Sequence, residues 1–250
     1  MNRPLLMPHI EGDTVGLGRN LTYGMLEKLG RAIVTGAYDA RTFPTEAQLA
    51  QHHGVSRSVT REAVKMLTAK GLLTARPRIG TVVQPTPAWN LFDPDVLRWL
   101  LERNFSLDLL RQFTQLRLAI EPEAAALAAR FAQDADIRSI TAGLERMQAA
   151  EQGSDDTLDA DIAFHVAILR ATQNPFYAQF RDTVAMALRT SIRFTNRVRG
   201  PNASLPEHAH VCNAIVAGDV EAARSTMHRL ITDVLDTVER HRTDEHPATK

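Results

Sequence analysis

The feature that most constrains this fold is a proline-containing segment, VVQPTPAWNLFDPD, over residues 82–95. Pro85, Pro87 and Pro94 each lack a backbone N–H and have a fixed φ, so no helix or strand can run through the whole segment. The two sides of it also differ in pattern. Apolar spacing predicts three helices and two short strands before the segment and only helices after it. The chain of 250 residues is therefore expected to form two domains.

The predicted fold class is mainly α, with a small helix-and-hairpin domain followed by an all-helical bundle. The N-terminal residues 1–20 are expected to be poorly ordered. We place the first domain at 21–83, the linker at 84–94, the helical domain at 95–241 and a charged tail at 242–250.

Formal charge divides at the same place, although the chain as a whole has a net charge of zero. Residues 1–84 hold 11 Lys and Arg against 6 Asp and Glu, which leaves 18 and 23 for the remainder. A basic first domain indicates a polyanionic partner, and an acidic second domain does not. The single cysteine, Cys212, fits a reducing compartment. We expect a cytoplasmic protein without a membrane span, because the sequence contains neither a signal peptide nor a long apolar run.

The pattern of residues 45–70 is typical of a helix-turn-helix. Thr45 is predicted to cap the first helix, with Gln48 reaching back to complete a capping box. The turn HHGVS follows, in which Gly54 can adopt a left-handed backbone, and a second helix begins near Ser56. Such a second helix usually presents its N-terminal residues outward.

Basic and hydroxyl side chains gather on this second helix and on the hairpin RPRIGT that follows it. Arg57 and Arg61 are four residues apart, so they share one helix face and can read guanine edges in a major groove, while nearby hydroxyls bind phosphate. The alternative is that these arginines only solvate a surface helix. The residues predicted to contact DNA are Ser56, Arg57, Ser58, Thr60, Arg61, Arg76, Arg78 and Gly80.

A second group of functional residues is predicted in the helical domain. Asp161 and His165 in DADIAFHVAIL are four residues apart on one helix face, and His208 follows near the start of a later helix. One aspartate and two histidines can bind a divalent transition metal. The alternative is that the Asp–His pair only stabilises its helix.

Residues 21–83 resemble the winged-helix domain of the GntR family of bacterial transcription regulators. FPTEAQLAQHHGVSRSVTREAVKMLTAKGLL follows the family pattern without gaps, except that Val59-Thr60 replaces a frequent Pro-Val. The resemblance implies that Arg57, Ser58, Arg61 and the wing around Gly80 contact operator DNA with palindromic half-sites, and that the protein is a homodimer.

Residues 95–240 resemble the FCD domain of the FadR-type branch of this family. The matching segments are RLAIEPEAAALAA, DIAFH, NP, EH and AIVAGDVEAARSTM. The resemblance implies metal ligands at Asp161, His165 and His208, but Leu230 replaces a fourth ligand, a histidine. Zinc or nickel binding is therefore in question, and His228 does not substitute, because two residues along a helix turn by about 200°.

The resemblance also implies a small carboxylate effector. Arg117 could bind this carboxylate in a bidentate manner, or could instead pair with Glu121 in its own helix. The segment WNLFDPDVLRWLLE resembles the branch members that repress galactonate catabolism, which implies a sugar-acid effector. We therefore predict a non-enzymatic, DNA-binding repressor of a sugar-acid operon, released by its effector. Two alternatives are a metalloenzyme using the Asp/His/His triad and a regulator that senses a fatty acyl thioester without metal.

Overall fold

The computed structural model divides into two compact units, Met1–Phe105 and Ser106–Lys250. The expected disorder of residues 1–20 and the end of the predicted tail, 246–250, lie outside the described residues. The structure describes residues 21–38, 43–103, 106–199 and 205–245.

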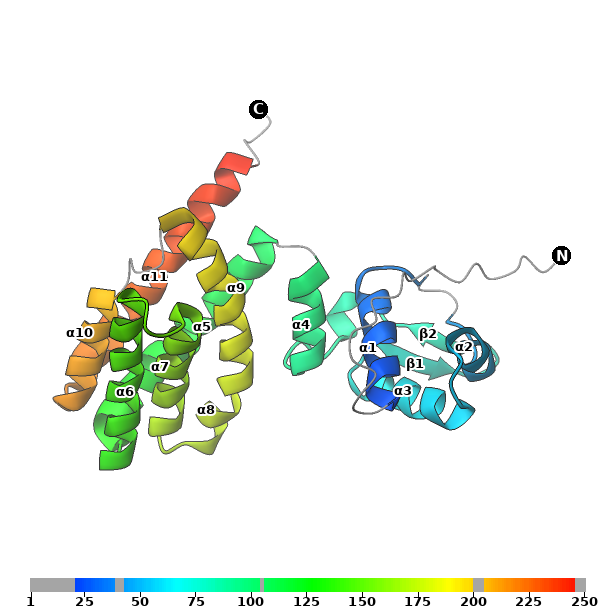
Figure 1. Ribbon diagram of the computed structural model, residues 1–250, viewed down its shortest axis with the longest axis horizontal. Helices are drawn as coiled ribbons and strands as arrows, with labels where there is room; N and C mark the ends of the chain where they lie inside the picture. Colours follow the sequence, from blue (N-terminus) through cyan, green and yellow to red (C-terminus); the bar gives the residue numbers. More distant parts are fainter. Residues whose placement is uncertain (1–20, 39–42, 104–105, 200–204, 246–250) are drawn as a thin grey trace. The chain divides into compact units, whose positions relative to one another are not determined.

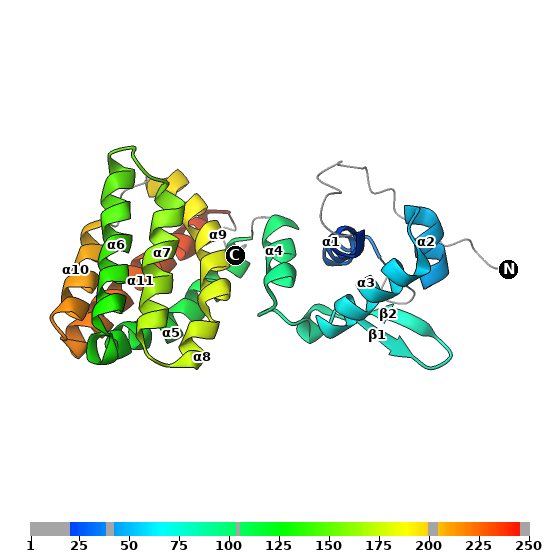
Figure 2. The same cartoon turned by 60° about the horizontal axis from the view of Figure 1, so that its bottom comes forward.

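The first unit is a helix-turn-helix followed by a two-stranded hairpin (Figures 1 and 2). The strands are antiparallel, with Leu73 opposite Val83 and Arg76 opposite Gly80. The described elements are α1 (Leu21–Val34), α2 (Glu46–His53), α3 (Arg57–Ala69), β1 (Leu73–Arg76), β2 (Gly80–Val83), the 3-10 helix η1 (Thr86–Ala88) and α4 (Pro94–Arg103). The predicted winged helix-turn-helix is confirmed.

Local signals in the sequence set the helix-turn-helix. The capping box of Thr45 and Gln48 is present at the start of α2, and Gly54 ends this helix at a left-handed φ of 64°. Ser56 caps α3, since its hydroxyl accepts a hydrogen bond from the Val59 N–H at 3.3 Å. Leu49 of α2 and Leu67 of α3 are fully buried in the same apolar core. The two capped helices are therefore also held together by tertiary packing.

The position of α4 corrects the predicted domain boundary. We expected a linker over 84–94 and a second domain from residue 95, but α4 packs against α1 in the first unit. The Trp99 ring is 1% exposed and lies against Gly30, where a Cβ would overlap the ring. Arg98 donates two hydrogen bonds of 2.8 Å to Glu27 of α1. This helix therefore completes the core of the first unit.

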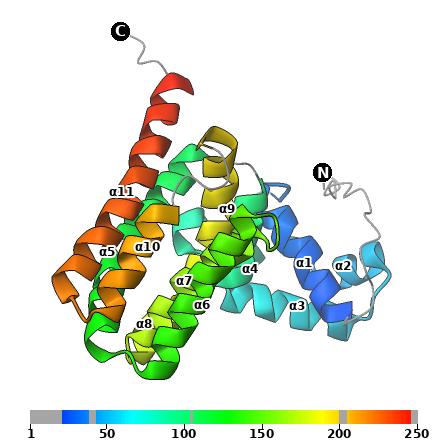
Figure 3. The same ribbon diagram turned by 60° about the vertical axis from the view of Figure 1, so that its left-hand side comes forward.

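The second unit consists of helices (Figure 3) packed around a large apolar core, with a smaller buried cluster formed by Leu107, Leu110 and Val238. The long helices α5 and α11 lie side by side, and α6 packs against α7. Ser106 and Asn174 cap α5 and α8, whereas α11 continues four residues beyond the predicted end of the helical domain at 241. The described helices are α5 (Leu107–Phe131), α6 (Asp134–Glu151), α7 (Thr157–Ala171), α8 (Pro175–Gln179), α9 (Arg181–Arg199), α10 (Leu205–Val216) and α11 (Val220–Glu245).

Candidate functional site

The N-terminal end of α3 presents an exposed basic face in the first unit. Arg57, Ser58 and Arg61 are exposed, as is the capping residue Ser56. Thr60 differs: it is 0% exposed, and its hydroxyl donates to the Ser56 carbonyl at 3.3 Å. The prediction that Thr60 contacts DNA is therefore wrong, because its side chain faces the core.

The tip of the β1–β2 hairpin presents two further arginines. Arg76 and Arg78 are exposed, and Gly80 is exposed with a φ of 95°. Arg78 has a φ of 62°, an uncommon conformation for a residue other than glycine, and this forms a tight tip closed by the Ile79 N–H bonded to the Arg76 carbonyl at 3.2 Å. The wing thus holds its cationic side chains on a short, defined turn.

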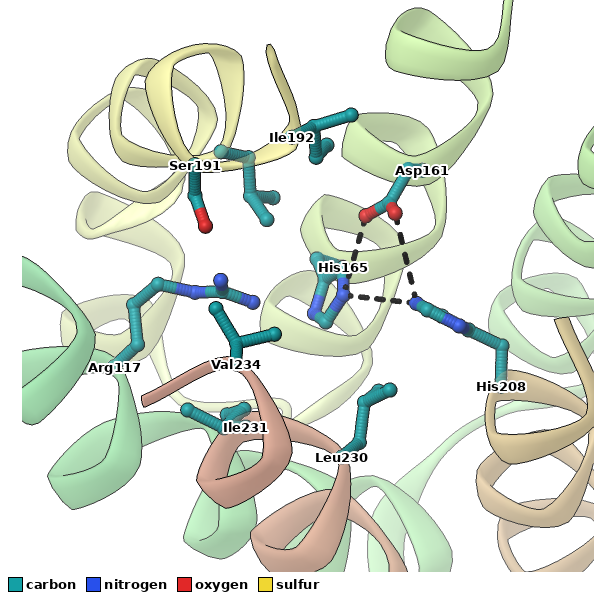
Figure 4. Close-up of a pocket in the computed structure, with 10 residues that line it drawn as sticks. Arg117, Asp161, His165, Ser191, Ile192, His208, Leu230, Ile231 and Val234 are labelled. Carbon is teal, nitrogen blue, oxygen red and sulfur yellow. Dashed lines mark hydrogen bonds and ion pairs between the residues drawn. The ribbon is translucent and has the colours of Figure 1, made fainter. Parts of the chain in front are cut away.

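A pocket in the second unit gathers the polar residues predicted in the helical domain (Figure 4). The pocket is small and partly open to solvent. Both polar and aliphatic side chains line it. The lining residues are Arg117, Asp161, His165, Leu188, Ser191, Ile192, His208, Leu230, Ile231 and Val234.

Asp161, His165 and His208 converge in this pocket, with one donor atom from each within 4.8 Å of the others. The two Nε2 atoms are 3.3 Å apart, and His165 Nε2 is 3.4 Å from Asp161 Oδ1. His208 Nε2 is 3.8 Å from Asp161 Oδ2. Donors on one tetrahedral zinc, each about 2.0–2.1 Å from the ion, are roughly 3.3–3.4 Å apart. The donor set and its spacing therefore fit a transition metal.

A buried ion pair lies behind this triad, on the other side of the His165 ring. Glu121 is 1% exposed, and its Oε1 accepts a hydrogen bond of 2.5 Å from Arg117 Nε. Its Oε2 lies 2.5 Å from His165 Nδ1. Burial alone would raise the pKa of Glu121, but Arg117 and His165 together lower this pKa to about 2. Glu121 is therefore a carboxylate.

Leu230 occupies the pocket wall opposite the triad. It is 4% exposed and lies on α11, facing the same space as Asp161, His165 and His208 (Figure 4). His228, two residues earlier, is exposed. Both observations confirm the predicted helix phase. Among the described residues that line this pocket, position 230 therefore provides an aliphatic side chain and not a fourth metal ligand.

Comparison with known proteins explains both units. Residues 24–83 match the family described as bacterial regulatory proteins, gntR family, and residues 112–233 match the FCD domain. An Escherichia coli regulator, YieP, is 34% identical over 209 residues, covering 82% of this chain and 90% of its own length. The chain belongs to the GntR family and carries an FCD domain.

Other relatives agree with this assignment. The Escherichia coli galactonate operon transcriptional repressor is 32% identical over 209 residues, covering 82% of this chain and 90% of the repressor. The structure of Lar, which controls expression of the Listeria monocytogenes agr system, aligns with a TM-score of 0.63 at 20% identity. It covers 89% of this chain and 98% of the Lar chain. The second likeness supports the fold alone.

The GntR-family chain is a DNA-binding transcription regulator and not an enzyme. Its partners are operator DNA and a small-molecule effector, which binds the FCD domain. The metalloenzyme alternative is therefore not supported. Within the described ranges, no helix combines the length and apolarity needed to cross a bilayer.

Sequence reasoning did not place Glu121 and Ser191 in the site. Glu121 was considered only as a helix partner of Arg117, because its contact with His165 joins α5 to α7 and depends on tertiary packing. Ser191 lies on α9, and its sequence neighbourhood carries no motif. Only the packing of five helices brings these side chains to one pocket.

Proposed function

We propose that this regulator is a repressor whose operator complex is released by a sugar acid bound at a metal in the FCD-domain pocket. The observation that carries the proposal is the triad of Asp161, His165 and His208 facing Leu230. Three protein donors would hold a zinc ion, with nickel the second candidate, and the ion would supply positive charge and open coordination positions.

The charges of the pocket favour an anionic effector only when a metal is present. Arg117 contributes one positive charge, and Glu121 and Asp161 contribute two negative charges. With neutral imidazoles the pocket has one excess negative charge, which disfavours a carboxylate. A divalent ion would make the net charge of the pocket positive. We therefore expect metal and acid to bind with positive linkage.

The chemistry of the effector is narrowed by two relatives. One is named for the galactonate operon, and another, 31% identical over 220 residues, is the putative regulator of an L-lactate dehydrogenase operon. Galactonate and lactate both carry a hydroxyl beside the carboxylate. Such a pair of oxygens suits the open positions of a three-ligand metal, and the aliphatic wall at Leu230 suits the carbon chain. This pattern supports a 2-hydroxy acid of the sugar-acid class rather than an acyl thioester.

On the DNA side, we propose that Arg57 and Arg61 read base edges in the major groove. Ser56, Ser58 and the wing residues Arg76, Arg78 and Gly80 would then contact the backbone or the minor groove. Because one recognition helix reads one half-site, this assignment supports a homodimer on a palindromic operator. Exposure of these side chains supports the assignment.

A ligand screen with two readouts tests the proposal. Thermal shift would be measured for galactonate, other aldonates, lactate and a long-chain acyl-CoA, each with zinc and with a chelator. Operator affinity would be measured in parallel by fluorescence anisotropy. We expect an aldonate to bind only with zinc and to weaken operator binding by roughly 5–150-fold, the usual range of coupling.

Three outcomes would contradict parts of the proposal. Acid binding that is unaffected by the chelator would exclude the metal. Operator release by the acyl-CoA alone would favour the thioester alternative. An aldonate that binds free and operator-bound protein equally would not be the effector, because linkage requires the two affinities to change by the same factor.

A further inference from the structure

We propose that Glu121 is a positioning residue of the pocket: its carboxylate orients the His165 ring so that Nε2 faces Asp161 and His208, and Arg117 fixes that carboxylate. The inference deepens the proposed function and rests on it for the role of the metal. Its geometric part concerns only side chains of this chain.

The contacts of the His165 ring indicate which of its two nitrogens bears the proton. Nδ1 lies 2.5 Å from Glu121 Oε2, and Nε2 lies 3.4 Å from Asp161 Oδ1. A neutral imidazole has one N–H and one lone pair, and an adjacent carboxylate favours the N–H on the nearer nitrogen. The proton is therefore expected on Nδ1, which leaves the Nε2 lone pair directed at the triad.

The surroundings of Glu121 hold its carboxylate in a fixed position. Its carboxylate is fixed on one side by Arg117, with hydrogen bonds of 2.5 and 3.4 Å, and contacts His165 on the other. All three side chains are at most 4% exposed, so water does not compete strongly for these contacts. Arg117 and Glu121 are four residues apart on α5, whereas His165 is on α7. The Arg117–Glu121 pair on α5 thus holds the His165 ring, which belongs to α7.

This arrangement changes the role expected for Arg117. Its Nε and one terminal nitrogen donate to Glu121, so those donors are engaged before any effector arrives. A carboxylate of the effector would have to displace Glu121 to use them, at the cost of leaving a buried anion unpaired. Arg117 therefore acts mainly through Glu121 rather than as a primary effector ligand.

A carboxylate that receives the second N–H of a metal-binding histidine raises ligand basicity and fixes the ring. Loss of such a partner usually weakens metal affinity by about 10–100-fold. The test compares Glu121→Gln, which keeps the shape, with the double variant Arg117→Gln/Glu121→Gln, which leaves no unpaired buried charge. Glu123→Gln is the control, because Glu123 lies on the same helix but is exposed and pairs with Arg224 at 2.6 Å.

Two measurements on the full-length chain decide the proposal. Long-range proton–nitrogen NMR of the metal-free, histidine-labelled protein reports the tautomer of His165. Competition with a chromophoric chelator reports zinc affinity. We expect the N–H on Nδ1 in wild type and in Glu123→Gln, with wild-type zinc affinity in that control. In both Glu121 variants we expect a shift toward the Nε2–H tautomer and zinc binding weakened by about 10–100-fold.

An unchanged tautomer in the two Glu121 variants would overturn the proposal. So would wild-type zinc affinity in the double variant with a loss in Glu121→Gln, because Glu121 would then serve only to neutralise Arg117. If Glu121→Gln fails to fold, as monitored by circular dichroism, the double variant decides alone. If wild type itself binds no zinc, the metal part of the proposed function fails, and the tautomer measurement still decides the positioning role.

Discussion

Replacing Leu230 with histidine is expected to make the protein less stable without zinc and more stable with it. The leucine is 4% exposed, and full burial of such a side chain contributes about 1.5–3 kcal/mol. An imidazole in its place has unmatched polar atoms in the absence of metal. We therefore expect the metal-free variant to lose about 1–3 kcal/mol of its free energy of unfolding.

With zinc the sign reverses, because the new imidazole faces the pocket shared by Asp161, His165 and His208. We expect at least a tenfold gain in zinc affinity, which corresponds to about 1.4 kcal/mol. At a zinc concentration 100 times the dissociation constant, binding stabilises the folded state by about 2.7 kcal/mol. The fourth ligand also takes a position that the acid would use, so operator release by the acid should weaken.

The assay is thermal unfolding with zinc and with a chelator, together with calorimetry of zinc binding. Leu144→His is the matched control, since Leu144 is 8% exposed in the same core but does not line the pocket. It should be destabilised under both conditions. If Leu230→His folds and binds zinc no better than wild type, residue 230 does not project toward the three donors in the way described.

Other predictions concern the first unit. Arg57→Ala or Arg61→Ala should weaken operator binding by about 1–3 kcal/mol and binding to random DNA far less, measured by anisotropy; equal losses on both would make these arginines phosphate contacts. Gly30→Ala should destabilise this unit by about 1–3 kcal/mol through overlap with the Trp99 ring, and an unchanged melting temperature would contradict this packing. Burial would raise the pKa of Glu27, but Arg98 and Arg31 lower it from 4.5 to about 2. Its stabilising effect is therefore complete above pH 4.5 and lost as pH falls toward 2, so the stability difference between wild type and Glu27→Gln should narrow over that range.

Sequence reasoning predicted those parts of the fold that depend on local signals. The capping box of Thr45, the left-handed turn at Gly54 and the cap at Ser56 each involve residues within a few positions of one another. The helix phase that turns Leu230 inward and His228 outward is also local, because it follows from the period of one helix.

The predictions that failed depended on contacts between distant segments. The α4 helix belongs to the first unit because Trp99 packs on Gly30, 69 positions earlier in the chain, and the prolines before α4 did not reveal this. The prediction of a DNA contact for Thr60 rested on its hydroxyl, although it stands where the family often has valine and its side chain faces the core. In both cases tertiary packing decided the outcome, and the local sequence did not show it.

The packing of α4 has a consequence for how an effector signal can travel along the chain. Lys70 directly follows α3, and its Nζ lies 2.8 Å from Asp93 and 2.9 Å from Asp95. Asp93 in turn caps α4 by accepting a hydrogen bond of 3.0 Å from the Asp95 N–H. The C-terminal end of α3 is thus joined to α4 by partly buried ion pairs in addition to the shared core. The two units divide directly after this helix, at Phe105 and Ser106. A change in the FCD domain that is transmitted through the backbone must therefore reach α4 first, and the Lys70 ion pairs connect α4 to the C-terminal end of α3.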